Sequence, residues 1–186
     1  MQLILDHDDA WLPVLGVDDV PTHGHRLPPD EVLDAWWQVF AEQEATAGFL
    51  LAPQGVVLGA ASLHVQPGTG AETVVELFRE HDLVVSDTDC TSHPTPLGIA
   101  RRLEHLRLLE LVDPAPDEPR VVLWRHLLWI WQLDDHDGPV TVTVTSESPS
   151  PQPAADLTSH VDDLARGLRR APIPHTAVHR QDEDRP

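Results

Sequence analysis

The chain has 186 residues, enough to bury the core of one domain. With 31 acidic residues and 12 basic ones, its formal net charge at pH 7 is −19. This charge repels nucleic acid and anionic membranes and favours a basic partner, although solubility alone also accounts for it. A single cysteine, Cys90, excludes an intramolecular disulfide and a four-cysteine zinc site. With no signal-peptide pattern at the N-terminus, the composition predicts a cytoplasmic protein.

The basic residues are all arginine, and lysine, asparagine and tyrosine are absent. Codons for these three missing residues are rich in A and T, so we expect a GC-rich bacterial genome. The preference for arginine is therefore not in itself a sign of phosphate recognition. The longest apolar stretch, residues 121–133, is interrupted by Arg125 and His126, so we expect no membrane partner.

The first half of the chain predicts two short edge strands, a helix and a hairpin. The apolar runs at residues 3–5 and 11–17 are typical of strands, and Pro13 favours an edge position. Pro29 suits the first turn of a helix over residues 29–47. The apolar face of this helix comprises Val32, Leu33, Trp36, Trp37 and Phe40. We expect both tryptophans in the core, with a surface anchor for a partner as the alternative. Residues 49–52 and 56–63 predict a β-hairpin.

The second half predicts two more helices followed by strands. Thr69 and Glu72 have the spacing of a capping box, which starts a helix over residues 71–82. Thr95 and Pro96 open a predicted helix over residues 95–108 as its N-cap and first residue. A short strand is expected at 109–113, and a strand of alternating valine and threonine at 140–145. For residues 121–133 the pattern is compatible with either a strand or a helix.

Residues 71–124, which include GIARRLEHLRLLELVD, resemble the second half of a winged helix-turn-helix domain. The resemblance implies a DNA-binding regulator acting as a dimer. Its groove and phosphate contacts would be made by Arg101, Arg102, His105 and Arg107. At the position of the wing, DPAPDEP carries three acids, and phosphate contact needs basic residues there. This charge favours use of the element as a protein-interaction scaffold.

Beyond the main domain, residues 1–147, SPSPQP at 148–153 has the composition of a linker. A C-terminal helix is predicted over 154–171, with an apolar seam of Leu157, Val161, Leu164 and Leu168. The seam either docks on the domain or binds a partner. A disordered tail is expected at 172–186. The fold class predicted is α+β: a mixed or antiparallel sheet, three helices, a winged-helix-like part at 71–133 and the C-terminal helix.

One cluster could carry metal chemistry. Cys90 and His93 have C-x-x-H spacing, and His23 and His25 could complete a tetrahedral site if the fold brought the two loops together. A metal-dependent enzyme is therefore one alternative function. Dinucleotide, P-loop, nucleophile-elbow and zinc-protease motifs are absent, so we expect no cofactor.

The function predicted from the sequence is that of a small, acidic, non-enzymatic protein-interaction or regulatory module. Its expected contact surface is the N-terminal third, where residues 1–50 hold ten acids and one arginine, plus the leucine seam if that seam is free. The partner expected is another protein, with a basic one favoured by charge and a homodimer left open. DNA binding and metal-dependent catalysis remain the alternatives.

Overall fold

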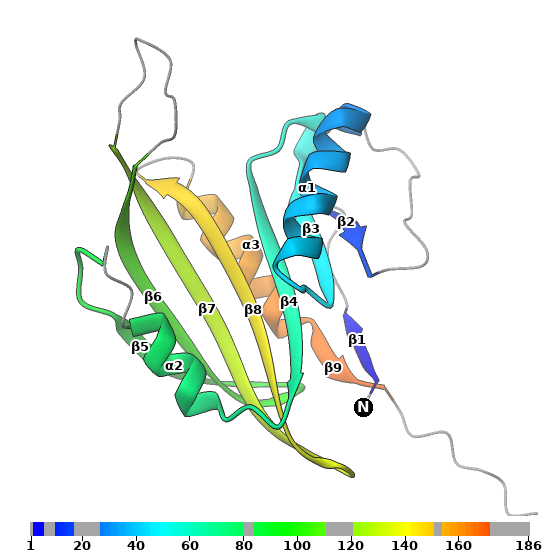
Figure 1. Ribbon diagram of the computed structural model, residues 1–186, viewed down its shortest axis with the longest axis vertical. Coiled ribbons are helices and arrows are strands. Elements are labelled where there is room, and N and C mark those ends of the chain that lie inside the picture. Colours follow the sequence, from blue (N-terminus) through cyan, green and yellow to red (C-terminus); the bar gives the residue numbers. More distant parts are fainter. Residues whose placement is uncertain are drawn as a thin grey trace, which may run out of the picture.

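The computed structural model describes residues 2–5, 10–16, 27–79, 84–110, 121–150 and 154–171. Its centre is an antiparallel seven-stranded sheet with the order β2-β3-β4-β8-β7-β6-β5 (Figure 1). These strands are β2 (Trp11–Leu15), β3 (Ala47–Leu51), β4 (Gly59–Pro67), β5 (Asp89–Thr95), β6 (Gly98–Glu110), β7 (Val121–Asp135) and β8 (Gly138–Ser150). A second, two-stranded sheet pairs β1 (Leu3–Leu5) with β9 (Leu168–Arg170).

Helices cover both faces of the large sheet. Helix α3 (Ala154–Arg166) lies on one face, and α1 (Asp30–Glu42) and α2 (Ala71–Arg79) lie on the other (Figure 1). Successive side chains of a strand point to opposite faces, so one strand serves both layers. In β8, Val142 and Val144 join the α3 core, while Thr143 is buried on the opposite face. Within the described part of the chain, no helix is long and apolar enough to cross a membrane.

The predicted helix at 95–108 is wrong, because this segment forms the hairpin of β5 and β6. Pro96 and Leu97 make the turn, and Gly98 adopts a φ of 135°, which favours glycine. Beyond the turn, β6 pairs with β7 from Arg101 opposite Ile130 to Glu110 opposite Val121. The leucine, arginine and glutamate of this segment favour a helix locally, but pairing with a long buried strand outweighs such small propensities.

The predicted α+β fold with a winged-helix-like second half is therefore wrong. The protein is mostly β-sheet, with seven antiparallel strands and three short helices in the described residues. Residues 121–135 form a strand, and β8 continues to Ser150 through the first part of the predicted linker. The helix expected at 154–171 ends at Arg166 and gives way to β9. The predicted tail, 172–186, lies outside the described residues.

Helix α1 packs closely against the sheet, but Phe40 is its only buried side chain. The ring of Phe40 fills the space where a side chain on Gly48 would lie, because a Cβ there would come within 2.2 Å of it. Trp36 is half-buried against Phe40, with 5.7 Å between ring centroids. Trp37, however, is 50% exposed. The prediction of a core position was wrong for Trp37, because only one side of the helix meets the sheet.

Candidate functional site

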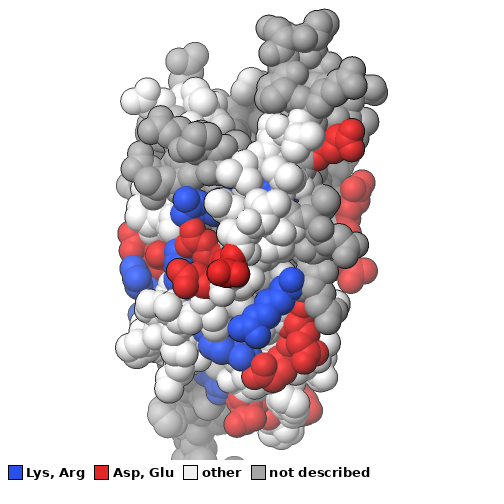
Figure 2. Space-filling model, turned by 90° about the vertical axis from the view of Figure 1, so that its left-hand side faces the viewer, with Lys and Arg blue, Asp and Glu red and all other residues white. Residues whose placement is uncertain are grey.

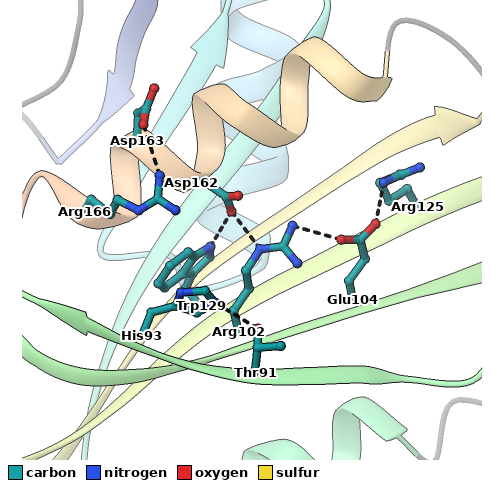
Figure 3. A network of polar contacts seen from close by, with 9 residues as sticks. All are labelled: Thr91, His93, Arg102, Glu104, Arg125, Trp129, Asp162, Asp163 and Arg166. Atoms are coloured by element: carbon teal, nitrogen blue, oxygen red, sulfur yellow. Dashed lines mark hydrogen bonds and ion pairs between the residues drawn. The ribbon is translucent and has the colours of Figure 1, made fainter.

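Arg102, predicted as a DNA contact, instead joins the sheet to α3 (Figure 3). Its Nε donates to Oδ1 of Asp162 at 2.9 Å, and its Nη2 lies 2.9 Å from Oε2 of Glu104. The indole Nε1 of Trp129 donates to the same Asp162 oxygen at 2.8 Å. Arg125 in turn pairs with Glu104. Both ends of the Arg102 guanidinium are thus engaged inside the protein.

The other three residues predicted to contact DNA are also engaged or buried. Arg101 pairs at 2.9 Å with Glu72 of α2. His105 is buried, with its ring centroid 4.2 Å from that of Phe78. Arg107 is buried, and its Nη2 lies 2.5 Å from Oε1 of Glu147. These residues lie on strand β6, so the recognition helix that their DNA role required is not formed.

Opposite charges alternate on the side of the molecule formed by β5, β6 and α2. Among the residues that the structure describes, Figure 2 shows arginines next to aspartates and glutamates on this side. The pairs Arg101–Glu72 and Arg102–Glu104 belong to this region. Such an arrangement cancels the local positive potential that phosphate binding needs.

The residues considered for a metal site do not converge where the structure describes them. Cys90 and His93 both lie on β5, and an odd separation along a strand points them to opposite faces. His93 bonds Thr91 at 2.9 Å and packs beside Trp129, while Cys90 is an exposed free thiol. His23 and His25 lie outside the described residues. Among the described residues, no group of three histidine, cysteine, aspartate or glutamate side chains could hold a metal ion.

The predicted apolar seam lies in the core, with Leu168 on β9 and the other three residues on α3. Leu157, Val161, Leu164 and Leu168 are each at most 3% exposed and belong to the same core as Trp129 and Trp131 of β7. Gly59 of β4 allows the helix to come this close, because a Cβ there would lie 2.6 Å from the Leu157 side chain. The structure therefore places the seam against the sheet, which was one of the two alternatives considered for it.

Helix α1 carries an exposed row of acidic and aromatic side chains, which we call the acidic stripe: Asp30, Asp34 and Trp37. They follow each other at steps of four and three residues and so share one face of the helix. All three are exposed, and α1 contains no basic residue. A half-exposed tryptophan beside two carboxylates combines an apolar contact with attraction for positive charge.

On the other side of α1 lies a groove of about 220 Å³, which we call the α1 groove. It is open along one side and lies between the helix and strands β4, β7 and β8. Its lining includes Trp36, Val39 and Gln43 of α1 and Ser62, Trp124 and Thr145 of the sheet. Glu147 also lines it, and this carboxylate is paired with Arg107 at 2.5 Å. The groove is thus walled by two indoles, and Glu147, the one charged residue in the described part of its lining, is compensated.

Ser62 and Thr145, which line the α1 groove, belong to a chain of polar contacts that connects two strands. Ser62 Oγ and Thr145 Oγ1 lie 2.7 Å apart, and His64 Nε2 lies 3.1 Å from Ser62 Oγ. Burial lowers the pKa of His64 below its ordinary value, and a hydrogen bond with the backbone of Glu44 opposes this only in part. The lowered pKa favours the uncharged imidazole. These contacts tie β4 to β8 and satisfy the hydroxyl groups within the protein.

Comparison with known proteins identifies a similar fold but no family. The sequence matches no protein-family model and no curated protein. Among solved structures it is similar to LpqN of Mycobacterium tuberculosis, whose crystal structure is described as that of a protein involved in cell envelope biogenesis. The TM-score is 0.53 with 8% sequence identity, over 91% of this chain and 83% of LpqN. The likeness concerns the fold alone and agrees with the β-rich architecture.

Sequence reasoning missed the α1 groove and found only part of the acidic stripe. The groove combines residues from α1, β4, β7 and β8, which are distant in sequence, and no local pattern predicts that they meet. The helix and its acidic character were predicted, and a surface role for its tryptophans was considered. The sequence feature that could have predicted the whole stripe is the i, i+4, i+7 spacing of Asp30, Asp34 and Trp37, which places the three residues on one face of the helix.

Proposed function

We propose that the protein is a non-enzymatic interaction module that binds a basic protein through the acidic stripe of α1. The observation that carries the proposal is Trp37, 50% exposed on a helix face that it shares with Asp30 and Asp34. Large aromatic residues with exposed apolar area are typical centres of protein interfaces. Surrounding carboxylates and a net charge of −19 select a basic partner and speed its approach.

The compartment belongs to the same proposal. Cys90 is a free and exposed thiol in the structure, which suits the reducing conditions of the cytoplasm. The description of LpqN concerns the cell envelope, and it is a statement about that protein. Fractionation of cells that produce this protein naturally, followed by immunodetection, tests the location: recovery in the envelope fraction contradicts a cytoplasmic module.

Site-specific photocrosslinking tests the contact surface. The photoreactive residue p-benzoylphenylalanine replaces Trp37 in the full chain, which is expressed in its native host and irradiated. A matched control carries the same residue in place of Leu77, which is 67% exposed on α2. We expect a basic protein to crosslink through position 37 and not through position 77. Equal crosslinking from both positions, or adducts with acidic proteins only, contradicts the proposal.

The charge component is tested with the partner that crosslinks. Its affinity for the purified protein should fall as salt rises, because exposed charges are screened. Replacing Asp30 and Asp34 by asparagine should weaken binding and flatten the salt dependence. The control replaces Asp137, an exposed acid in the β7–β8 turn, by asparagine. If the affinity is unchanged by the substitutions of Asp30 and Asp34, the acidic stripe is not the contact surface.

A further inference from the structure

The α1 groove has the size and lining of a receptor for one aromatic ring. Its volume of about 220 Å³ exceeds the roughly 150 Å³ of an apolar protein cavity that holds benzene. Trp36 and Trp124 provide two indole rings, and Val39 adds an aliphatic wall. Aromatic rings stack on one another in offset or edge-to-face geometry, which adds to the gain from burying their surface.

The polar groups of the groove favour an uncharged occupant. Ser62 and Thr145 already bond each other at 2.7 Å, so neither hydroxyl needs a partner from a ligand. Glu147 is held by Arg107 at 2.5 Å. A lysine or arginine side chain entering the groove would compete with Arg107 for this carboxylate, whereas a neutral ring leaves the pair intact. The positive charge of a partner is better placed on the acidic stripe.

The groove and the acidic stripe flank the same helix. Trp36 lines the groove and Trp37 belongs to the stripe, and consecutive residues of an α-helix point about 100° apart. We propose that the α1 groove receives an aromatic side chain of the basic partner, whose binding segment therefore carries an aromatic residue next to basic ones. This inference rests on the proposed function and specifies the chemistry of its partner.

Two peptides separate the aromatic anchor from the charge. The pentapeptide RRFRR has both features, and RRARR keeps the charge but lacks the ring. Affinities for the full-length protein are measured by isothermal titration calorimetry at physiological salt. We expect RRFRR to bind about tenfold more tightly than RRARR, as for an anchor residue that fills a pocket. Replacing Asp34 by asparagine should weaken both peptides by the same factor.

A matched pair of variants locates the ring. Gln43→Trp places an indole at the exposed rim of the groove, without entering the core. Gln66→Trp makes the same change at an exposed position of β4 outside the groove lining. We expect Gln43→Trp to bind the two peptides equally and Gln66→Trp to keep the tenfold preference. Unfolding curves that match those of the parent protein show that both variants are folded.

The outcomes distinguish the anchor from the proposed function. If the parent protein binds both peptides equally and Asp34→Asn weakens both, the contact with the acidic stripe is supported. The proposal that the groove binds an aromatic side chain is then overturned. If the preference persists in Gln43→Trp, the ring binds elsewhere and the anchor is again overturned. If neither peptide binds, the proposed contact with the acidic stripe is contradicted. Titration of indole into isotopically labelled protein, followed by NMR, then tests separately whether the α1 groove binds an aromatic ring. Shifts at the Trp36 and Trp124 indoles support the ring site, and their absence overturns it.

Discussion

Arg102 of β6 and Asp162 of α3 form the ion pair that joins the C-terminal helix to the sheet, with 2.9 Å between Nε and Oδ1. Burial by itself lowers the pKa of Arg102, but the hydrogen bonds and charges of Asp162 and Glu104 outweigh it and hold the pKa above its ordinary value. The guanidinium is therefore charged at all accessible pH. Its role in the structure is to compensate two partly buried carboxylates (Figure 3).

Replacing Arg102 by alanine should destabilise the fold by about 2 kcal/mol, because Asp162, whose side chain is 17% exposed in the parent structure, then keeps only the Trp129 indole as a described partner. Urea unfolding followed by tryptophan fluorescence measures the loss. Arg101→Ala is the control, since its partner Glu72 is 78% exposed and such pairs contribute at most about 1 kcal/mol. Equal effects of the two substitutions would show that the Arg102 network is not structural.

Leu164→Ala should destabilise the protein by about 3 kcal/mol, within the range for deleting a buried leucine side chain from a packed core. Leu164 is 2% exposed between α3 and the sheet. The same change at Leu77, 67% exposed on α2, should shift the free energy of unfolding by less than about 0.5 kcal/mol. Chemical denaturation compares the two variants. A neutral Leu164→Ala would mean that α3 does not dock on the sheet in solution.

His64 should make stability fall as the solution is acidified. Its pKa in the folded protein is lowered from an ordinary value of 6.5, mainly by burial. The unfolded chain therefore binds the proton first, so the contribution is present above pH 6.5 and is lost as pH falls through and below that value. The free energies of unfolding of the parent and of His64→Gln are compared from about pH 8 downward, in steps of about one pH unit. Their difference should change below pH 6.5, whereas parallel curves would contradict this role.

Duplex DNA should not bind. Arg101, Arg102 and Arg107 each pair with a carboxylate of the protein, and the net charge is −19. Fluorescence anisotropy of a labelled random-sequence duplex, measured between about 50 and 200 mM salt, tests this expectation. Binding that weakens steeply with salt, and that is lost in the Arg101→Ala, Arg102→Ala double variant, would show that these arginines leave their partners for phosphate.

Several elements could be predicted because their signals are local. Pro29 and the acids after it indicate the start of α1, and the apolar spacing that follows indicates a helix. The alternation of residues 140–145 predicts a strand with two different faces, which is observed in β8. Pro13 predicts an edge strand, and β2 lies at the edge of the sheet. In each case the stabilising contacts or steric limits lie within a few residues.

The hairpin of β5 and β6 shows where local signals fail. Residues 95–108 have helix-favouring side chains and an apparent N-cap, and their pattern resembles a recognition helix. Their strand conformation depends on β7, a long apolar strand that pairs with β6 on one side and with β8 on the other. Many backbone hydrogen bonds and a buried face outweigh propensity differences of a few tenths of a kcal/mol per residue.

The sequence by itself determined the acidic charge, the lone cysteine, the amphipathic helix at α1 and the strand alternation of β8, because these follow from composition or from spacing along the chain. Tertiary structure decided that Arg102 pairs with Asp162, that the predicted C-terminal seam is buried and that Trp37 is exposed while Trp36 borders a groove. The physical reason is the same throughout: a helix or strand defines which side chains share a face, but only the packing of distant segments selects the face that is buried.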